Sequence, residues 1–73
     1  MTHTPTNSPA ALGAAVNAAR KNLGLTQPQL ALAAGVGVRF IVELEAGKPT
    51  IRLDALLKVI NALGGALAVE GWA

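Results

Sequence analysis

Four of the eight glycines divide the chain into segments of helical length. Gly24, Gly35, Gly47 and Gly64 each follow a stretch in which apolar residues recur at three- and four-residue steps, and a glycine just past such a stretch is a common helix end. This spacing predicts four helices. The second is expected to be only about two turns long, because Gly35 follows soon after its start.

Capping residues mark where the first three helices begin. Ser8 precedes Pro9, and serine is a good N-cap while proline is tolerated at the first helical position. Thr26 opens a capping-box pattern at the second helix, and Gly37 is a weaker cap for the third. The stripes expected to face the core are Leu12, Ala15, Val16, Ala19 and Leu23; Leu30 and Ala33; Ile41 and Leu44; and Leu53, Leu56, Leu57, Ile60 and Leu63.

The last residues have a different period. In the stretch ALAVEGWA, Leu67 and Val69 alternate with smaller or polar residues, which is typical of a β-strand. A single strand in a helical chain needs a hydrogen-bonding partner, and a second copy of the chain supplies one. We therefore expect a short C-terminal β-strand that pairs across a homodimer, with Leu67, Val69 and Trp72 in the dimer interface. A frayed terminal segment is the alternative.

Composition argues against a metal site, a cofactor and catalysis. The chain has no cysteine, and its single histidine, His3, lies in a polar N-terminal segment. We expect no metal, no cofactor and no enzymatic activity, because no nucleophile has a base beside it in the sequence pattern. The acidic residues are scattered over Glu43, Glu45, Asp54 and Glu70.

Charge and hydropathy set limits on the partners. No apolar run approaches the ~20 residues that span a bilayer, and the N-terminus lacks the pattern of a signal peptide, so a cytoplasmic protein with no membrane partner is expected. The net charge of +2 at pH 7 permits nucleic-acid binding without arguing for it. Whether the chain binds nucleic acid must therefore be judged from the placement of its six basic residues.

Two short helices separated by a tight turn that contains glycine match the helix-turn-helix geometry. The stretch LGLTQPQLALAAGVGVRFIVELEAGKPT resembles the XRE-type family of Cro and lambda-repressor-like DNA-binding domains, and the resemblance runs from about residue 12 to residue 63. It implies an all-α, lambda-repressor-like bundle that binds double-stranded operator DNA. The matching residues are Leu23, Gly24, Leu25, Thr26, Gln27, Leu30, Ala31, Ala34, Gly35, Val36, Ile41, Leu44, Glu45, Gly47 and Lys48.

The expected strand after Gly65 replaces the fifth helix that usually follows in this family. This departure makes the chain similar to the HipB-like antitoxins, small dimeric repressors that bind the operator of their own operon and neutralise a HipA-like kinase toxin. The resemblance therefore implies a kinase-type toxin as a protein partner, and Trp72 either covers the dimer core or docks on that toxin. Two alternatives stay open: a phage-like or metabolic repressor without a toxin partner, and a protein-interaction module that binds no DNA.

The predicted third helix has an outer face suited to a DNA major groove. At about 100° per residue, Val38, Arg39, Val42 and Glu43 lie away from the core positions, and we expect them to contact bases. Arginine pairs with guanine, a carboxylate accepts from cytosine, and valine methyls meet thymine methyls. The alternatives are that Arg39 is solvated or bound to phosphate and that the two valines pack on a neighbouring helix. Phe40 borders the core and is expected to pack there.

Three residues are expected to contact DNA phosphates. Gln27 lies at the N-terminal end of the second helix, where donors and the helix dipole favour a phosphate, and the matching glutamine in the family clamps the DNA backbone. Lys48 and Arg52 follow the third helix and are placed to hold the flanking strand. Arg52 also stands where the family usually has a serine or threonine cap, so Thr50 is a possible substitute cap for the fourth helix.

The resemblance also implies a structural ion pair between Arg20 and Glu45. In the family, the matching residues tie the first helix to the end of the third. We expect this pair to fix the recognition helix. The complete domain organisation predicted from the sequence is a disordered tail over residues 1–8, a helix-turn-helix DNA-binding domain over residues 9–64, and a dimerisation strand and tail over residues 65–73.

Overall fold

The computed structural model describes residues 8–65, and these residues form four helices. They are α1 (Pro9–Asn22), α2 (Gln27–Ala34), α3 (Val38–Glu45) and α4 (Leu53–Ala62). The predicted all-helical class and the number of helices are confirmed for this part of the chain. Residues 1–7 of the predicted tail (residues 1–8) and the predicted strand with Leu67, Val69 and Trp72 lie outside the described residues.

The first two helices begin with the caps that the sequence predicted. The side chain of Ser8 accepts a hydrogen bond from the backbone N–H of Ala11 at 3.1 Å. At α2 the capping box is complete: the Gln29 N–H donates to Thr26 Oγ1 at 3.2 Å, and the Thr26 N–H donates to Gln29 Oε1 at 2.8 Å. Gly35 then ends α2 with φ +73°, a left-handed conformation that glycine adopts without strain.

The start of α4 differs from the prediction. Thr50 was named as a possible substitute cap, but the N-cap position is Arg52, whose side chain makes no capping hydrogen bond. The carboxylate of Asp54 lies in the first turn instead, where the helix dipole favours a negative charge. A hydrogen bond from Arg52, followed by one from the backbone N–H of Ala55, lowers the pKa of Asp54.

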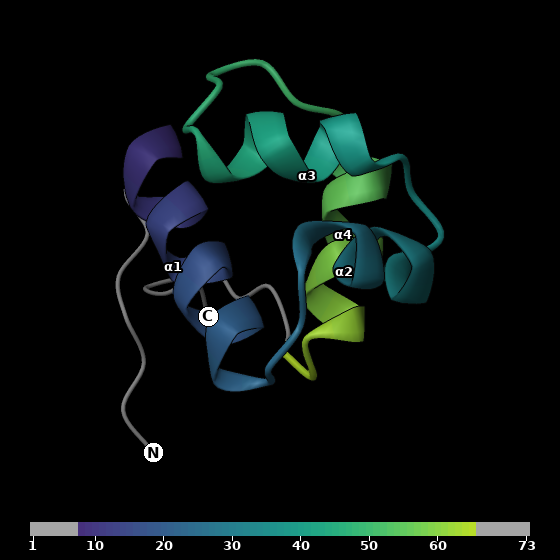
Figure 1. Cartoon of the computed structure of the whole chain (residues 1–73). Helices are drawn as coiled ribbons and strands as arrows, with labels where there is room; N and C mark the ends of the chain where they lie inside the picture. The colour runs from purple at the N-terminus through teal and green to yellow at the C-terminus, as the bar shows by residue number, and fades with distance from the viewer. Residues whose placement is uncertain (1–7, 66–73) are drawn as a thin grey trace, which may run out of the picture.

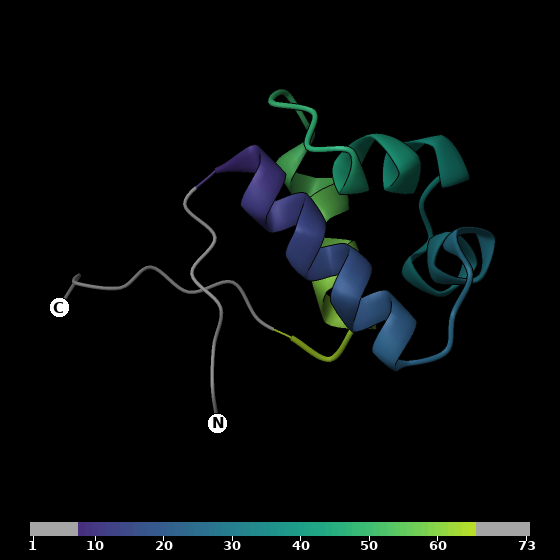
Figure 2. The same ribbon diagram turned by 60° about the vertical axis from the view of Figure 1, so that its left-hand side comes forward.

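Helix α3 lies across one end of the molecule, with α1 against its C-terminal half and α2 near its start (Figure 1). The view turned by 60° shows the same arrangement, with α4 behind α1 and beside α2 (Figure 2). Each helix contributes to one core, whose buried members are Val16, Leu30, Ala31, Ile41, Leu44, Leu56 and Val59. None of the helices between residues 8 and 65 is long and apolar enough to cross a membrane.

Some predicted core residues are exposed. In α2 the buried neighbour of Leu30 is Ala31, whereas Ala33 faces solvent. This prediction was wrong because α2 packs against α3 and α4 through the side that carries residues 30, 31 and 34. Leu23, Leu53 and Leu57 are also exposed, since they lie beyond the area that neighbouring helices cover.

The backbone of α1 touches the end of α3 at Gly13. A Cβ placed on Gly13 would lie 2.5 Å from the carbonyl oxygen of Leu44 and 2.8 Å from that of Glu45. These distances are shorter than real Cβ contacts, so only glycine allows the two helices to approach this closely. The sequence pattern gave no sign of this contact, because a glycine inside a helix is compatible with many structures.

Candidate nucleic-acid interface

Helix α3 has one side fixed in the core and one side free. Ile41 and Leu44 are fully buried, and Phe40 packs against the same core from a half-buried position. On the other side Arg39 is exposed, and Val38 and Val42 are each 45% exposed. The residues expected to contact bases therefore lie on the outer face of α3, apart from Glu43, which is partly covered.

Glu43 and Lys48 are ion-paired. Lys48 Nζ lies 3.1 Å from Glu43 Oε2, on a partly exposed surface beyond the end of α3. The sequence assigned these residues separate roles, one toward a base and the other toward a phosphate. The two side chains are therefore paired with each other across the end of α3.

Arg52 is paired with Asp54 in a two-point contact. Arg52 Nη2 lies 2.6 Å from Asp54 Oδ2, and Arg52 Nε donates to Asp54 Oδ1 at 3.1 Å. Both side chains are mostly exposed, so water weakens this pair. Its small expected stability means that a phosphate competes readily for the guanidinium.

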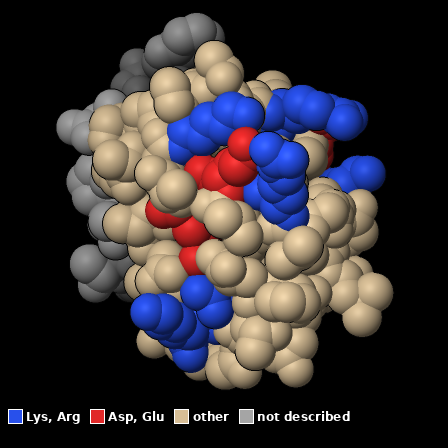
Figure 3. Space-filling view, turned by 45° about the horizontal axis from the view of Figure 1, so that its top comes forward, with Lys and Arg blue, Asp and Glu red and all other residues tan. Residues whose placement is uncertain are grey.

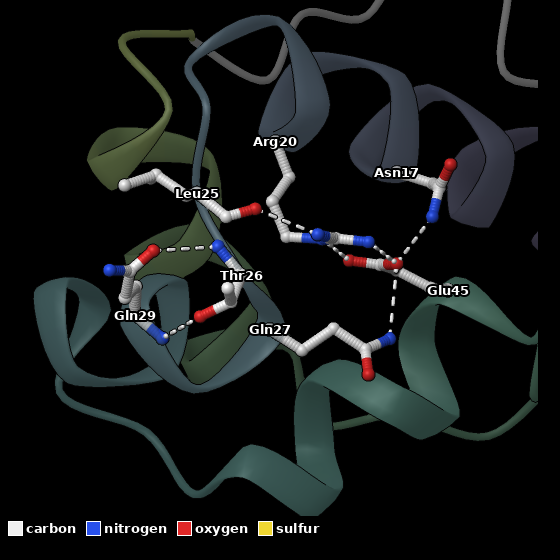
Figure 4. Close-up of polar contacts among 7 residues, drawn as sticks. All are labelled: Asn17, Arg20, Leu25, Thr26, Gln27, Gln29 and Glu45. Atoms are coloured by element: carbon white, nitrogen blue, oxygen red, sulfur yellow. Dashed lines mark hydrogen bonds and ion pairs between the residues drawn. The ribbon is translucent and has the colours of Figure 1, made fainter.

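A buried carboxylate joins α1, the start of α2 and the end of α3 (Figure 4). The side chain of Glu45 is only 5% exposed. Arg20 Nε donates to Glu45 Oε2 at 2.7 Å, and Arg20 Nη2 donates to Oε1 at 3.0 Å. The third guanidinium nitrogen, Nη1, donates to the backbone oxygen of Leu25 at 2.8 Å. These hydrogen bonds therefore connect α1, the residues just before α2 and the end of α3.

Two amides complete this Glu45 cluster. Asn17 Nδ2 donates to Glu45 Oε1 at 2.7 Å, and Gln27 Nε2 donates to the same oxygen at 3.2 Å. Sequence reasoning missed Asn17, although it lies one helical turn before Arg20 and so on the same side of α1. It also assigned Gln27 to phosphate alone. Among the described residues, no buried side-chain nitrogen or oxygen lacks a hydrogen-bond partner.

The cluster controls the ionisation of Glu45. Burial by itself would raise the pKa of this carboxyl group, but the hydrogen bonds from Arg20, Asn17 and Gln27 outweigh it. The pKa of Glu45 therefore lies below the ordinary value of 4.5. The charged form is the one that the fold stabilises.

This shift predicts an acid-dependent loss of stability. Because the folded pKa of Glu45 is depressed, its contribution is fully present at pH values above the unfolded pKa and is lost as pH falls through the folded pKa. We expect the melting temperature to fall once the pH drops below about 4.5, with the carboxyl carbon of Glu45 titrating below that value in an NMR experiment. A Glu45 resonance that titrates at or above pH 4.5 would contradict this prediction. The variant Asp54→Asn separates any contribution from Asp54, whose pKa is also lowered.

Charge is not uniform over the face that includes α3. Lys and Arg side chains gather in two places in the space-filling view, with acidic side chains between them (Figure 3). Such a surface differs from a continuous basic stripe, which binds phosphates without regard to sequence. The charged side chains of this face therefore do not form one continuous basic patch.

Helices α2 and α3 meet at Gly35 in the geometry of a helix-turn-helix, a class of DNA-binding domain whose second helix enters the major groove. The chain belongs to the HTH_3 helix-turn-helix family, whose model matches residues 16–69. It is an XRE-type transcription regulator that binds DNA, as the resemblance predicted.

Known relatives agree with this assignment. The uncharacterized HTH-type transcriptional regulator y4mF of Sinorhizobium fredii (strain NBRC 101917 / NGR234) is 53% identical over 57 residues, which cover 78% of this chain and 75% of the relative. The fold is similar to that of HipB in the HipB–O4 20mer complex and the HipA–HipB–O2–O3 complex, each with a TM-score of 0.83, 24% identity and coverage of 92% of this chain and 94% of the other. The clp gene regulator ClgR of Corynebacterium glutamicum matches with a TM-score of 0.72 and 33% identity, over 92% of this chain and 85% of its own.

Proposed function

We propose that this chain is a sequence-specific transcriptional repressor that reads operator DNA with the outer face of α3. The supporting observation is that Arg39, Val38 and Val42 are exposed together while the opposite side of α3 is buried. An arginine and two small apolar side chains are suited to base edges in a major groove. The Glu45 cluster holds the end of this helix against α1 and α2, so the reading face has a fixed orientation.

Phosphate contacts by Gln27, Lys48 and Arg52 would set the register of α3 on the DNA. Gln27 is half-buried, and its amide nitrogen has a second hydrogen beyond the one donated to Glu45. Lys48 and Arg52 each have a carboxylate partner in the absence of DNA, and both pairs are exposed enough for exchange with a phosphate. The contacts by Lys48 and Arg52 are therefore expected to weaken strongly with salt.

A homodimer would place two copies of α3 in successive major grooves about 34 Å apart on a palindromic operator. An exposed apolar side of α4 supports the proposed homodimer. Leu53 is 59% exposed and Leu57 is 39% exposed, and these residues lie one helical turn apart. The segment expected to form the dimerisation strand, with Leu67, Val69 and Trp72, follows α4 directly in the sequence.

We further propose that the repressor is the antitoxin of a type II toxin–antitoxin operon, with a HipA-like kinase toxin as its protein partner. The similarity in fold to HipB, which was solved in a complex with HipA, supports this. The identity of 33% with ClgR, a clp gene regulator, favours a second candidate, a repressor of other genes that has no toxin partner. Co-expression with the product of the adjacent gene, followed by co-purification, distinguishes the two.

Footprinting on the DNA upstream of its own gene tests the central proposal. A repressor that controls its own promoter is expected to protect a two-fold symmetric site whose half-sites lie about one helical turn apart. Scrambled DNA of the same length and base composition is the control. Equal binding to both DNAs, or no binding to either, would rule out sequence-specific repression at this promoter.

The roles of Arg39 and Lys48 lead to different mutant phenotypes. Arg39→Ala is expected to weaken operator binding by about 2 kcal/mol, roughly 30-fold, with much less effect on scrambled DNA, because the lost contact is to a base. Lys48→Ala should weaken binding to both DNAs equally and lower the salt slope by about 1, because the lost contact is to a phosphate. Gel-shift titrations at several salt concentrations measure both effects. The assignment fails if the two variants lose specificity to the same extent.

A further inference from the structure

The connector between α3 and α4 has two basic residues, and each is paired with a carboxylate of the helix beside it. Residues 46–52 form this connector, with Lys48 in its first half and Arg52 at its end. Lys48 Nζ lies 3.1 Å from Oε2 of Glu43, which belongs to the last turn of α3. Arg52 Nη2 lies 2.6 Å from Oδ2 of Asp54, which belongs to the first turn of α4. Both cations that are proposed to hold DNA phosphates therefore have an acidic partner.

Arg39 is arranged differently. It is exposed on the outer face of α3, and no carboxylate within the described part of the chain forms an ion pair with it. The two pairs of the connector contribute little to the stability of the fold, because the side chains of Lys48 and Glu43 are 44% and 35% exposed and the second pair is more exposed still. The carboxylates thus lie beside the cations proposed to bind phosphate and not beside the one proposed to read a base.

A carboxylate and a DNA phosphate compete for the same cation. When Lys48 moves to a phosphate, Glu43 loses its partner beside the negatively charged DNA backbone, and like charges within the screening length of about 8 Å repel each other. We propose that Glu43 and Asp54 are intramolecular competitors of DNA phosphate that weaken binding to any DNA sequence, and that Glu43 does not contact a base. This inference rests on the proposed function and adds to it the residues that limit the strength of its phosphate contacts.

Glu43→Gln tests the proposal, because it removes the charge and keeps the size of the side chain. In gel-shift titrations this variant should bind the operator and the scrambled DNA more tightly by the same factor, about threefold, which is the size of a typical exposed ion pair. Asp54→Asn should also tighten binding to both DNAs. A base contact gives the opposite result: if Glu43 accepts a hydrogen bond from cytosine, Glu43→Gln weakens operator binding and leaves binding to scrambled DNA unchanged.

A double-mutant cycle separates competition for Lys48 from a general loss of negative charge. When Glu43→Gln is added to Lys48→Ala, it should no longer tighten binding, because the ammonium group for which the carboxylate competes is absent. Added to Arg52→Met, the same substitution should keep its full effect, because that variant leaves the pair of Glu43 and Lys48 intact. Equal gains in the two backgrounds would overturn the proposal.

The salt dependence gives an independent readout. In the parent protein, a carboxylate that loses its lysine takes up a cation from solution, which offsets a counterion released from the DNA. Glu43→Gln removes this offset, so the slope of log K against log salt should become steeper by up to about 1. An unchanged slope would contradict competition between Glu43 and phosphate. Thermal melting of each variant checks that it is folded.

The outcomes distinguish this inference from the proposed function. Weaker operator binding by Glu43→Gln, with a footprint still present, removes the inference and leaves sequence-specific repression standing. A missing footprint, with the expected gains on scrambled DNA, removes sequence-specific repression and leaves the competition standing. Loss of binding to every DNA removes both.

Discussion

Replacing Arg20 with methionine is expected to destabilise the folded domain by about 3–5 kcal/mol. Arg20 and Glu45 are both almost fully buried, so removal of the cation leaves a carboxylate without its main partner in a poorly solvated site. The amides of Asn17 and Gln27 remain, but neither carries a charge. Small domains are typically stable by only about 5–15 kcal/mol, so the variant should be close to unfolding at room temperature. Urea unfolding followed by circular dichroism measures the change.

Arg52→Met is the matched control for this experiment. It breaks a pair of the same chemical type, with a contact of 2.6 Å, but both side chains are mostly exposed. Water screens an exposed pair of this kind, so the control should unfold at nearly the same urea concentration as the parent protein. Equal losses in the two variants would show that burial does not determine the effect.

Local features of the structure could be predicted from the sequence. The capping box of Thr26 and Gln29 and the left-handed Gly35 depend on residues within a few positions of each other, and both are present. The buried side of α3 could be predicted from helical periodicity, because Ile41 and Leu44 are strongly apolar and lie three positions apart. These interactions need no knowledge of the other helices.

Contacts between helices could not be predicted in the same way. Ala31 and Ala33 are the same residue type, so only the position of the core decides which one is buried. The amide of Asn17 reaches Glu45 across 28 positions, and nothing in the local pattern indicates that contact. The pairing of Glu43 with Lys48 likewise depends on how the chain turns after α3. The resemblance to a known family supplied Arg20 and Glu45, which the periodicity alone would not have joined.

Gly13→Ala is expected to destabilise the folded protein, whereas replacing glycine with alanine in a helix usually stabilises it. In an open helical position, alanine in place of glycine stabilises by about 0.5–1 kcal/mol. At Gly13 the added Cβ would meet the carbonyl oxygens of Leu44 and Glu45 at 2.5 and 2.8 Å. Both obstacles are backbone atoms, which cannot rotate away as a side chain does. We therefore expect a loss of about 3 kcal/mol, at the upper end of what overpacking usually costs.

The Gly13→Ala substitution should also affect the outer face of α3, which is proposed to contact DNA. Relief of the clash requires α1 and the end of α3 to move apart, and that movement stretches the hydrogen bonds from Asn17 and Arg20 to Glu45. The control is Ala18→Gly, a change at an exposed position of the same helix, which should cost about 1 kcal/mol through helix propensity alone. Thermal melting of both variants, with operator binding of the folded Gly13→Ala protein, measures the two effects. A Gly13→Ala protein that melts at or above the parent temperature would mean that α1 and α3 are not packed as closely as these distances require.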